Sequence, residues 1–402
     1  MMSIEEPNIV QSHAPWQMDH PLWRLGFRPF YLLAAGFAAL AMPLWMASYF
    51  GALPGWRQLS VGWHMHEMVY GMALAVIIGF LYTAGRTWTG LWTPTKGHLA
   101  ALAALWLAGR VAMLAAPQAL AAIIDLLFLP LAAWPLYRVL QQSGNRRNLF
   151  LVALLGLLSL ANAAFHGAVL GLLALAPAWT MHAAILIIVV IESVIGARVI
   201  PMFTRNGAPG AQPVVHPGRD KITLALMVLA SLAWLVGMAA PVVAPAVALL
   251  ACAAAGATLL RLAGWQPQRT LHAPLLWILH LSYAWIPIGF LLLALAALKL
   301  VSASAAFHAL TVGSMAGLIL GMMSRTALGH TGRPLLATRL DVAMYGLIQA
   351  GALVRVAAAF DAFGLRNGAL LLATGCWSTA FLLYIIGYGP SLLRPRIDGR
   401  EG

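Results

Sequence analysis

The stretch that decides the fold is Trp63-His64-Met65-His66-Glu67-Met68, which opens an apolar run that ends at Arg86-Thr87-Trp88-Thr89-Gly90. About 20 apolar residues are enough for a helix to cross the hydrocarbon core of a bilayer, and this run has that length. It carries histidines at its start and an arginine at its end, and such side chains are costly in lipid. The stretch therefore predicts a transmembrane helix that carries candidate functional residues at its ends.

A second apolar run repeats this pattern later in the chain. It begins at His308 and ends in Arg-Thr-Ala-Leu-Gly at 325–329. Counted from His66 and from His308, glycines follow in the same H-x4-G-x7-G spacing. We interpret these glycines in two ways, as room for a flat macrocycle beside the helix or as sites of close helix packing. One apolar segment later, each half carries an arginine, Arg110 in the first and Arg355 in the second.

The composition excludes a soluble globular domain. Hydrophobic residues make up 62% of the 402 residues and charged residues only 9%, whereas a soluble domain has about 25% charged residues. We therefore expect an all-α polytopic membrane protein with about twelve transmembrane helices embedded in a lipid bilayer. The expected helices centre on residues 27–50, 64–85, 98–116, 118–138, 149–171, 178–200, 222–240, 242–262, 273–298, 304–324, 340–360 and 367–388.

The basic residues predict the orientation. The net charge is +13, and the arginines and lysines gather in alternate connections, which indicates the positive-inside pattern and not a nucleic-acid surface. Both termini are therefore expected in the cytoplasm. We expect a cytoplasmic segment over 1–20 without a cleavable signal peptide, a single twelve-helix domain over 21–390, and a basic cytoplasmic tail over 391–402.

Five histidines from different expected helices fall near the outer ends of those helices: His64, His66, His166, His182 and His308. Neutral imidazole suits iron, copper and zinc, and the scarcity of carboxylates and thiolates disfavours calcium and iron–sulfur clusters. The pattern predicts a metal site on the outer face, with hydrogen-bonded interfacial histidines as the alternative. His64 and His66 are two residues apart, so on a continuous helix they face nearly opposite ways and would serve two different centres.

Buried charges give further candidates. Arg110 and Asp125 are expected at similar depth, and an ion pair between them is weighed evenly against a ligand-binding role for Arg110. Glu67 and Glu192 are the carboxylates expected to carry protons in catalysis. The alternative for Glu192 is a neutral acid that is hydrogen-bonded to a neighbouring helix.

Several strings of the chain resemble those of the NnrS family. They are WHMHEM at 63–68, the Arg-Thr-x-x-Gly that starts at Arg86, ARVIPMFTRN at 197–206, HALTVG at 308–313 and MSRTALGHTGRPL at 323–335, and the resemblance runs from PLWRLGFRPF at 21–30 onward. The resemblance implies a haem- and copper-containing protein of the bacterial inner membrane that is tied to nitric oxide metabolism and nitrosative stress. It assigns no ligand residue by residue.

Given those cofactors, we expect a b-type haem whose axial ligands include His66 or His308, with His64 also at the cofactor. Arg110 and Arg355 are expected to face the haem propionates, because guanidinium groups suit carboxylates; Asp361 is the alternative partner for Arg355. The short connection 171–177 is expected to bring His166 close to His182 as a copper site, with two water-bonded histidines as the alternative.

His66, His182 and His308 begin the second, sixth and tenth expected helices, which suggests three four-helix units. This arrangement is similar to the catalytic subunit of haem–copper oxidases and nitric oxide reductases, although the seventh helix here lacks the histidine of their copper site. Fold analogy alone does not establish function. We expect nitric oxide as ligand or substrate, converted at a metal site towards the periplasmic side; the alternatives are a non-catalytic haem/copper sensor or a transporter. The electron donor is left open.

Overall fold

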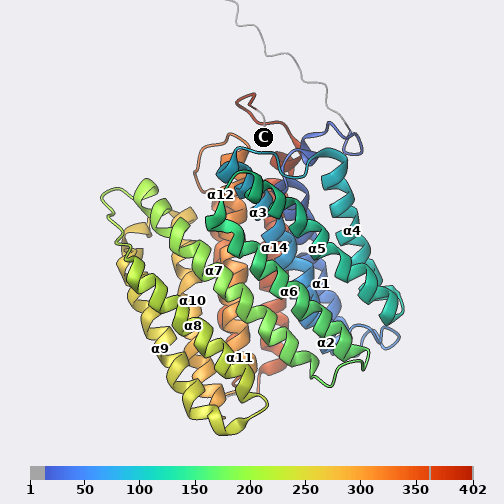
Figure 1. Ribbon diagram of the computed structural model, residues 1–402, viewed down its shortest axis with the longest axis vertical. Helices are drawn as coiled ribbons and strands as arrows, with labels where there is room; N and C mark the ends of the chain where they lie inside the picture. The colour runs from blue at the N-terminus through green and yellow to red at the C-terminus, as the bar shows by residue number, and fades with distance from the viewer. Residues whose placement is uncertain (1–13, 362–363, 401–402) are drawn as a thin grey trace, which may run out of the picture.

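Twelve helical segments of the computed structural model are long and apolar enough to cross a membrane, which confirms the expected fold class (Figure 1). The structure describes residues 14–361 and 364–400, and the regular secondary structure of this part is entirely helical. Ten crossings are single α-helices: α1 (Phe27–Tyr49), α4 (Lys96–Ala115), α5 (Gln118–Gln142), α6 (Leu149–Val169), α7 (Pro177–Gly207), α8 (Pro217–Gly237), α9 (Ala244–Gly264), α10 (Pro274–Ala297), α13 (Arg339–Ala357) and α14 (Arg366–Leu393).

The two apolar runs that begin near His66 and His308 form composite crossings, which means that each consists of two α-helices joined by a π-helical segment. The first consists of α2 (Val61–His66), the π-helical segment η2 (Glu67–Ala73) and α3 (Leu74–Thr89). The second consists of α11 (Ala303–His308), the π-helical segment η6 (Ala309–Ala316) and α12 (Gly317–His330). In both, the π-helical turn begins directly after the matched histidine. Such widened turns are rare and occur frequently at functional sites.

Close packing is the role that the structure gives to the matched glycines. A Cβ atom on Gly71 would stand 2.8 Å from Cε1 of Phe37, and one on Gly313 would stand 2.4 Å from the ring of Trp285. Real Cβ atoms do not approach neighbours so closely, so only glycine lets these aromatic rings lie against the helix. The space beside the glycines is therefore filled by protein.

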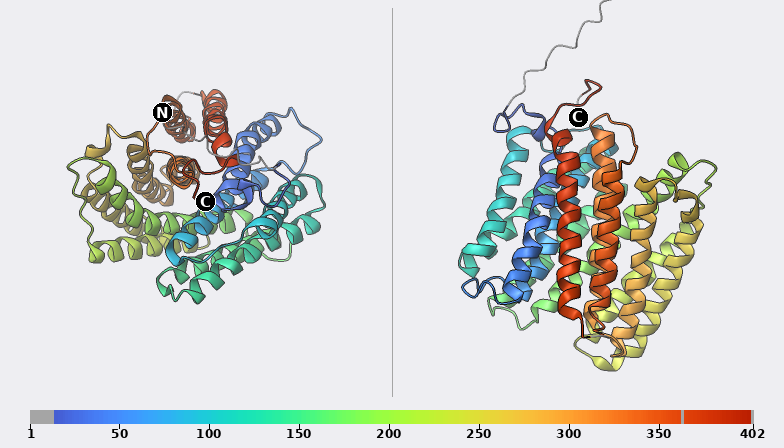
Figure 2. Two further views of the ribbon diagram at one scale, coloured as in Figure 1. Left: turned by 90° about the horizontal axis from the view of Figure 1, so that it is seen from above. Right: turned by 180° about the vertical axis from the view of Figure 1, so that it is seen from behind.

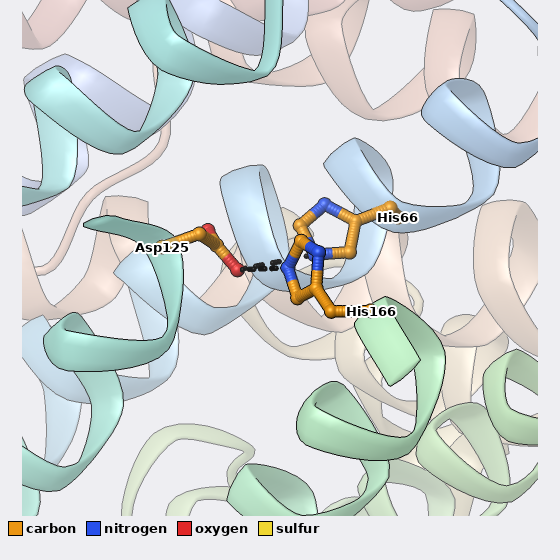
Figure 3. A group of neighbouring side chains, drawn as sticks. All are labelled: His66, Asp125 and His166. Carbon is orange, nitrogen blue, oxygen red and sulfur yellow. Dashed lines mark hydrogen bonds and ion pairs between the residues drawn. The ribbon is translucent and has the colours of Figure 1, made fainter. Parts of the chain in front are cut away.

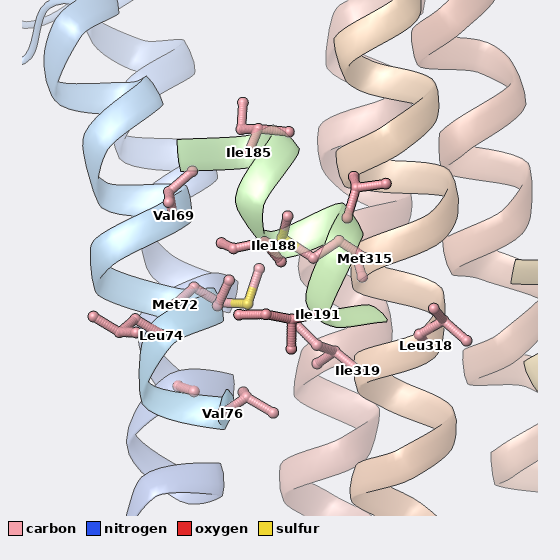
Figure 4. Close-up of a cluster of buried hydrophobic side chains, with 14 of the residues drawn as sticks. Val69, Met72, Leu74, Val76, Ile185, Ile188, Ile191, Met315, Leu318 and Ile319 are labelled. Carbon is pink, nitrogen blue, oxygen red and sulfur yellow. The ribbon is translucent and has the colours of Figure 1, made fainter. Parts of the chain in front are cut away.

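The three helices whose starts carry His66, His182 and His308 share one apolar core. Figure 4 shows side chains of η2 and α3 facing those of α7 and of η6 and α12, with Ile188 and Ile191 between Met72 and Met315. The hairpins α4–α5 and α8–α9 lie on opposite sides of the molecule (Figure 2). The relationship among three four-helix units stays a prediction, and this shared central core supports it.

The C-terminal tail packs against one end of the bundle. Figure 1 shows α2 and α11 at the end away from the C-terminus. At the C-terminal end, the buried Arg28 donates from Nη1 to the carbonyl oxygens of Leu392 at 2.7 Å and Arg394 at 2.8 Å. Arg396 donates to the carbonyl oxygen of His330 at 3.1 Å. The described part of the expected tail is therefore docked against α1 and α12.

Candidate metal and cofactor sites

A cavity of about 370 Å³, here termed the histidine cavity, lies among α1, α2–η2, α7, α11–η6, α13 and α14. Its polar lining consists of three histidines, two arginines and hydroxyl groups: His64, His182, His308, Arg355, Arg366, Tyr49, Ser304, Thr311 and Thr374. Its apolar lining is rich in methionine and tryptophan: Met42, Met46, Met65, Met68, Met72, Met315, Trp45 and Trp377. Three of the histidines selected from the sequence therefore line one space.

His308 is oriented by a hydrogen bond on one edge of its ring. Its Nδ1 lies 2.7 Å from the carbonyl oxygen of Ser304, one helical turn earlier. A carbonyl oxygen can only accept, so Nδ1 carries the proton and Nε2 carries the lone pair. The His308 ring is thus oriented by Ser304, and in its neutral form its Nε2 is available to a metal ion.

His64 and His182 are held by stacked rings. His64 lies parallel to Trp45, with ring centroids 5.4 Å apart and planes at 7°. Its Nδ1 is buried without a hydrogen-bond partner, which costs free energy unless a ligand or water satisfies the atom. His182 stacks on Phe307, with ring centroids 3.7 Å apart.

The hydrogen bonding of His182 differs from that of His308. Its Nδ1 accepts a hydrogen bond from Trp234 Nε1 at 3.3 Å. An accepting Nδ1 places the proton on Nε2, so His182 in this tautomer is a hydrogen-bond donor and not a metal ligand.

Two guanidinium groups line the cavity without a carboxylate partner. Arg355 Nη2 donates to Ser304 Oγ at 3.2 Å, and in residues 14–361 and 364–400 neither Arg355 nor Arg366 forms an ion pair. Asp361 accepts instead from the backbone N–H of Arg366 at 3.1 Å. Arg355 is half-buried and Arg366 is exposed, so the half-buried guanidinium of Arg355 in particular favours an anionic ligand.

A second polar group, here termed the Asp125 cluster, is buried among α2–η2, α4, α5 and α6. It consists of His66, Glu67, Arg110, Asp125, Asn162 and His166, and each of these residues is at most 4% exposed. Groups this deeply buried must satisfy one another or bind a ligand. His66 belongs to this cluster and His64 to the cavity, as the helical period predicts for residues two apart.

Three ligand atoms of the Asp125 cluster converge (Figure 3). Asp125 Oδ2 lies 3.2 Å from His66 Nε2 and 3.1 Å from His166 Nε2. With metal–ligand bonds of roughly 2 Å, neighbouring ligand atoms of a tetrahedral site stand about 3.3 Å apart. His66 Nδ1 lies 2.8 Å from Glu67 Oε1, and a metal-binding histidine usually donates its other ring N–H to such a carboxylate. The ligand atoms of His66, Asp125 and His166 are therefore close enough together to hold a metal ion. Such an ion would replace the hydrogen bond between His66 Nε2 and Asn162 Oδ1, which lie 2.9 Å apart.

Arg110 binds both carboxylates of the cluster. Its Nη1 donates to Glu67 Oε1 at 2.5 Å and its Nη2 donates to Asp125 Oδ1. Asn162 Nδ2 donates to Asp125 Oδ2 at 2.7 Å. Of the two interpretations of Arg110, the structure has the ion pair with Asp125, and Arg110 does not line the histidine cavity.

The structure separates His166 from His182, although the connection between their helices is short. His166 faces Asp125 and His66, whereas His182 contacts Phe307 and Trp234. Neighbouring helices bring backbones together, but the helical phase of each residue decides where its side chain points. The expected copper pair is therefore not formed, and His166 stands with His66 instead.

Glu192 lies deeper in the bundle. Its Oε2 accepts from Ser314 Oγ at 2.9 Å, while its Oε1 is buried without a partner. It lines a mainly apolar cavity of about 100 Å³ together with Tyr31 and Met315. Met315 also lines the histidine cavity, so the two spaces share this side chain.

Some site residues were not selected from the sequence. Asn162 is a lone amide in an apolar helix, and this was its only signal. Arg366 lies beyond the chain turn after α13, so no helical spacing connects it to Arg355. The methionines at 65, 68 and 72 follow a helical stripe that an ordinary core also shows.

The family model described as NnrS protein matches residues 21–396 of the chain. No curated protein matches the chain.

Proposed function

The chain belongs to the NnrS family, and from this premise we propose that it is a haem- and copper-binding protein of the bacterial inner membrane that acts on nitric oxide. The family assignment supports a role in the response to nitric oxide. The observation that carries the cofactor proposal is the histidine cavity, in which His308, His64 and two arginines without counter-charges line one space.

The lining of the histidine cavity fits a haem. A haem iron can be bound by the imidazole of a histidine, and the Nε2 lone pair of His308 would supply such a ligand. His64 is the second candidate ligand, because its Nδ1 is buried and unpaired. Arg355 and Arg366 would hold the propionates, and the methionines and tryptophans would contact the macrocycle. The volume of about 370 Å³ lies within the range of roughly 300–1,000 Å³ for ligand pockets.

His182 has a different part in this proposal. A bound haem iron supplies the coordination of the diatomic ligand, and hydrogen-bond donors around the iron decide between binding and activation. The tautomer of His182 makes its Nε2–H such a donor. We therefore assign His182 the role of a hydrogen-bond donor to the bound diatomic ligand and not that of a copper ligand.

The Asp125 cluster is the candidate copper site. Imidazole nitrogen and carboxylate oxygen bind divalent copper well, and copper stands at the top of the affinity order of the divalent first-row metals. His66, Asp125 and His166 would be the ligands, with Glu67 orienting His66. Copper there would supply a one-electron centre close to the haem cavity, since His64 and His66 belong to the same short helix.

The orientation follows from the positive-inside pattern. The C-terminal end of the bundle carries the basic connections, so we place it in the cytoplasm and the histidine cavity towards the periplasm. Protons would reach the cavity from Glu192 or Glu67. The non-catalytic alternative, a sensor, uses the same cavity and differs only in turnover.

Absorption spectra test the proposal. The protein purified in detergent should give a reduced-minus-oxidised spectrum of a b-type haem, and nitric oxide should shift its Soret band. His308→Ala should lose most of the haem, whereas His98→Ala, at an exposed residue outside the cavity, should keep it. Full haem content in both His308→Ala and His64→Ala would refute the assignment of the cavity. Consumption of nitric oxide by the reduced protein, measured with an electrode, distinguishes an enzyme from a sensor.

A further inference from the structure

A basic pocket that the proposed chemistry does not use lies at the other end of the bundle, among η3 (Arg146–Asn148), α7, α8 and α9. It measures about 550 Å³. Five cationic side chains and one carboxylate line it: Arg147, Arg198, Arg205, Lys221, Arg261 and Asp220. These residues come from four segments, so the fold gathers their charge at one place.

Arg261 is the most deeply buried cation of this pocket. Its residue is 1% exposed, and its Nη2 donates to two neutral groups, Ser193 Oγ at 2.6 Å and the hydroxyl of Tyr283. Its Nη1 stands 3.9 Å from Asp220 Oδ1, which is beyond hydrogen-bond distance. Its Nε is buried without a partner. A buried guanidinium with such a distant counter-charge is only weakly compensated.

Two of the other cations, Arg198 and Arg205, are oriented by neutral acceptors. Arg198 Nη1 donates to Asn148 Oδ1 at 2.7 Å, and Arg205 Nη2 donates to the carbonyl oxygen of Pro213 at 3.2 Å. Among the described residues, Arg147, Arg198, Arg205 and Lys221 form no ion pair. Neutral acceptors fix the direction of a guanidinium group without cancelling its charge, so the pocket keeps its positive potential for an anion.

Apart from Asn206, the rest of the lining is apolar. Val194, Ala197, Pro201, Met202 and Leu224 lie on α7 and α8 in the same pocket. The pocket thus combines cations near the helix ends with an apolar wall that continues along the helices. A free phosphate ion would contact only the cations, whereas an amphipathic anion would contact both parts.

We propose that this pocket binds the phosphate group of an anionic phospholipid, with an acyl chain lying along the apolar wall. Basic pockets between transmembrane helices on the cytoplasmic side are suited to such headgroups. The lipid phosphate would add a second anion beside Arg261, whose one carboxylate partner in the described residues is the distant Asp220, and would tie α8 and α9 to α7 and η3.

The test compares two double variants of equal charge. Arg147→Gln with Lys221→Gln removes two exposed cations of the pocket; Arg146→Gln with Arg339→Gln removes two exposed cations at the same end of the bundle but outside the pocket. Each protein is titrated with phosphatidylglycerol, with phosphatidylcholine and with inorganic phosphate, and bound lipid is counted by native mass spectrometry. Each basic residue near an anionic headgroup contributes roughly fivefold in affinity.

The pocket variant should therefore bind phosphatidylglycerol about 30-fold more weakly than the wild-type protein, while the control variant stays within about twofold. Phosphatidylcholine should bind weakly and equally to all three proteins. Equal loss of phosphatidylglycerol in both double variants would overturn the proposal, since it would indicate surface charge alone. Displacement of the lipid by millimolar inorganic phosphate would overturn the lipid assignment and indicate a site for the free ion.

Discussion

His64 and His66 lie two residues apart on α2 and belong to two different sites. His64 stacks on Trp45 and lines the histidine cavity, whereas His66 hydrogen-bonds Glu67 and Asn162 in the Asp125 cluster. One short helix therefore contributes a histidine to each of the two proposed cofactor sites.

The two histidines should lose different metals when they are replaced. We expect His64→Ala to lower the haem content and keep copper, because it leaves the Asp125 cluster intact. His66→Ala should lower copper and keep haem. Haem is measured from the pyridine haemochrome and copper by elemental analysis of the same samples. If His66→Ala loses haem and His64→Ala does not, the cofactor assignment of the two sites must be exchanged.

The two echoing arginines should behave differently as well. Arg355→Leu should reduce haem retention while the protein keeps its thermal stability, since in the described residues Arg355 contacts only the hydroxyl of Ser304 by hydrogen bond. Arg110→Leu should destabilise the protein by about 3–5 kcal/mol, because it leaves two carboxylates buried without their cation. Tryptophan fluorescence on heating measures the stability, and Arg355→Lys serves as the matched variant that keeps a charge. Equal destabilisation by both leucine variants would show that Arg355 has a structural role.

Hydropathy was sufficient to predict the fold from the sequence, because a helix satisfies the backbone hydrogen bonds of each crossing within lipid. The helical period was likewise sufficient to divide His64 from His66. The residues that each histidine contacts were not predictable from the sequence, because these contacts depend on the rotation of each helix about its axis. His166 and His182 are near in sequence on adjacent helices, yet their phases direct them to different sites. The π-helical turns after His66 and His308 shift the phase of the residues that follow, and no residue type in either run marks such a turn.

The matched glycines test the packing of the composite helices. Gly313→Ala should destabilise the protein by about 1–3 kcal/mol, because the added methyl group would overpack against the ring of Trp285. Gly346→Ala is the control: nothing lies within 4 Å of a Cβ at this residue of α13, and alanine is the better helix former. The thermal midpoint should fall in the first variant and stay or rise in the second. An unchanged midpoint for Gly313→Ala would mean that Trp285 moves aside without cost.

Glu192 should affect turnover and not cofactor content. Its carboxyl group accepts a hydrogen bond from Ser314 and has one buried oxygen without a partner. It lines a cavity that shares Met315 with the histidine cavity. Glu192→Gln keeps the shape and the acceptor oxygen but cannot release or take up a proton. If the protein reduces nitric oxide, this variant should consume it at least tenfold more slowly, since general acid–base groups contribute roughly 10²–10⁴-fold. Its Soret band and copper content should equal those of the wild-type protein.

Ser314→Ala is the matched variant, because it removes the hydrogen bond and leaves the proton-carrying group, and we expect it to retain most of the rate. Equal rates for Glu192→Gln and the wild-type protein would assign the proton path to Glu67, whereas loss of haem in Glu192→Gln would show that Glu192 only supports the core.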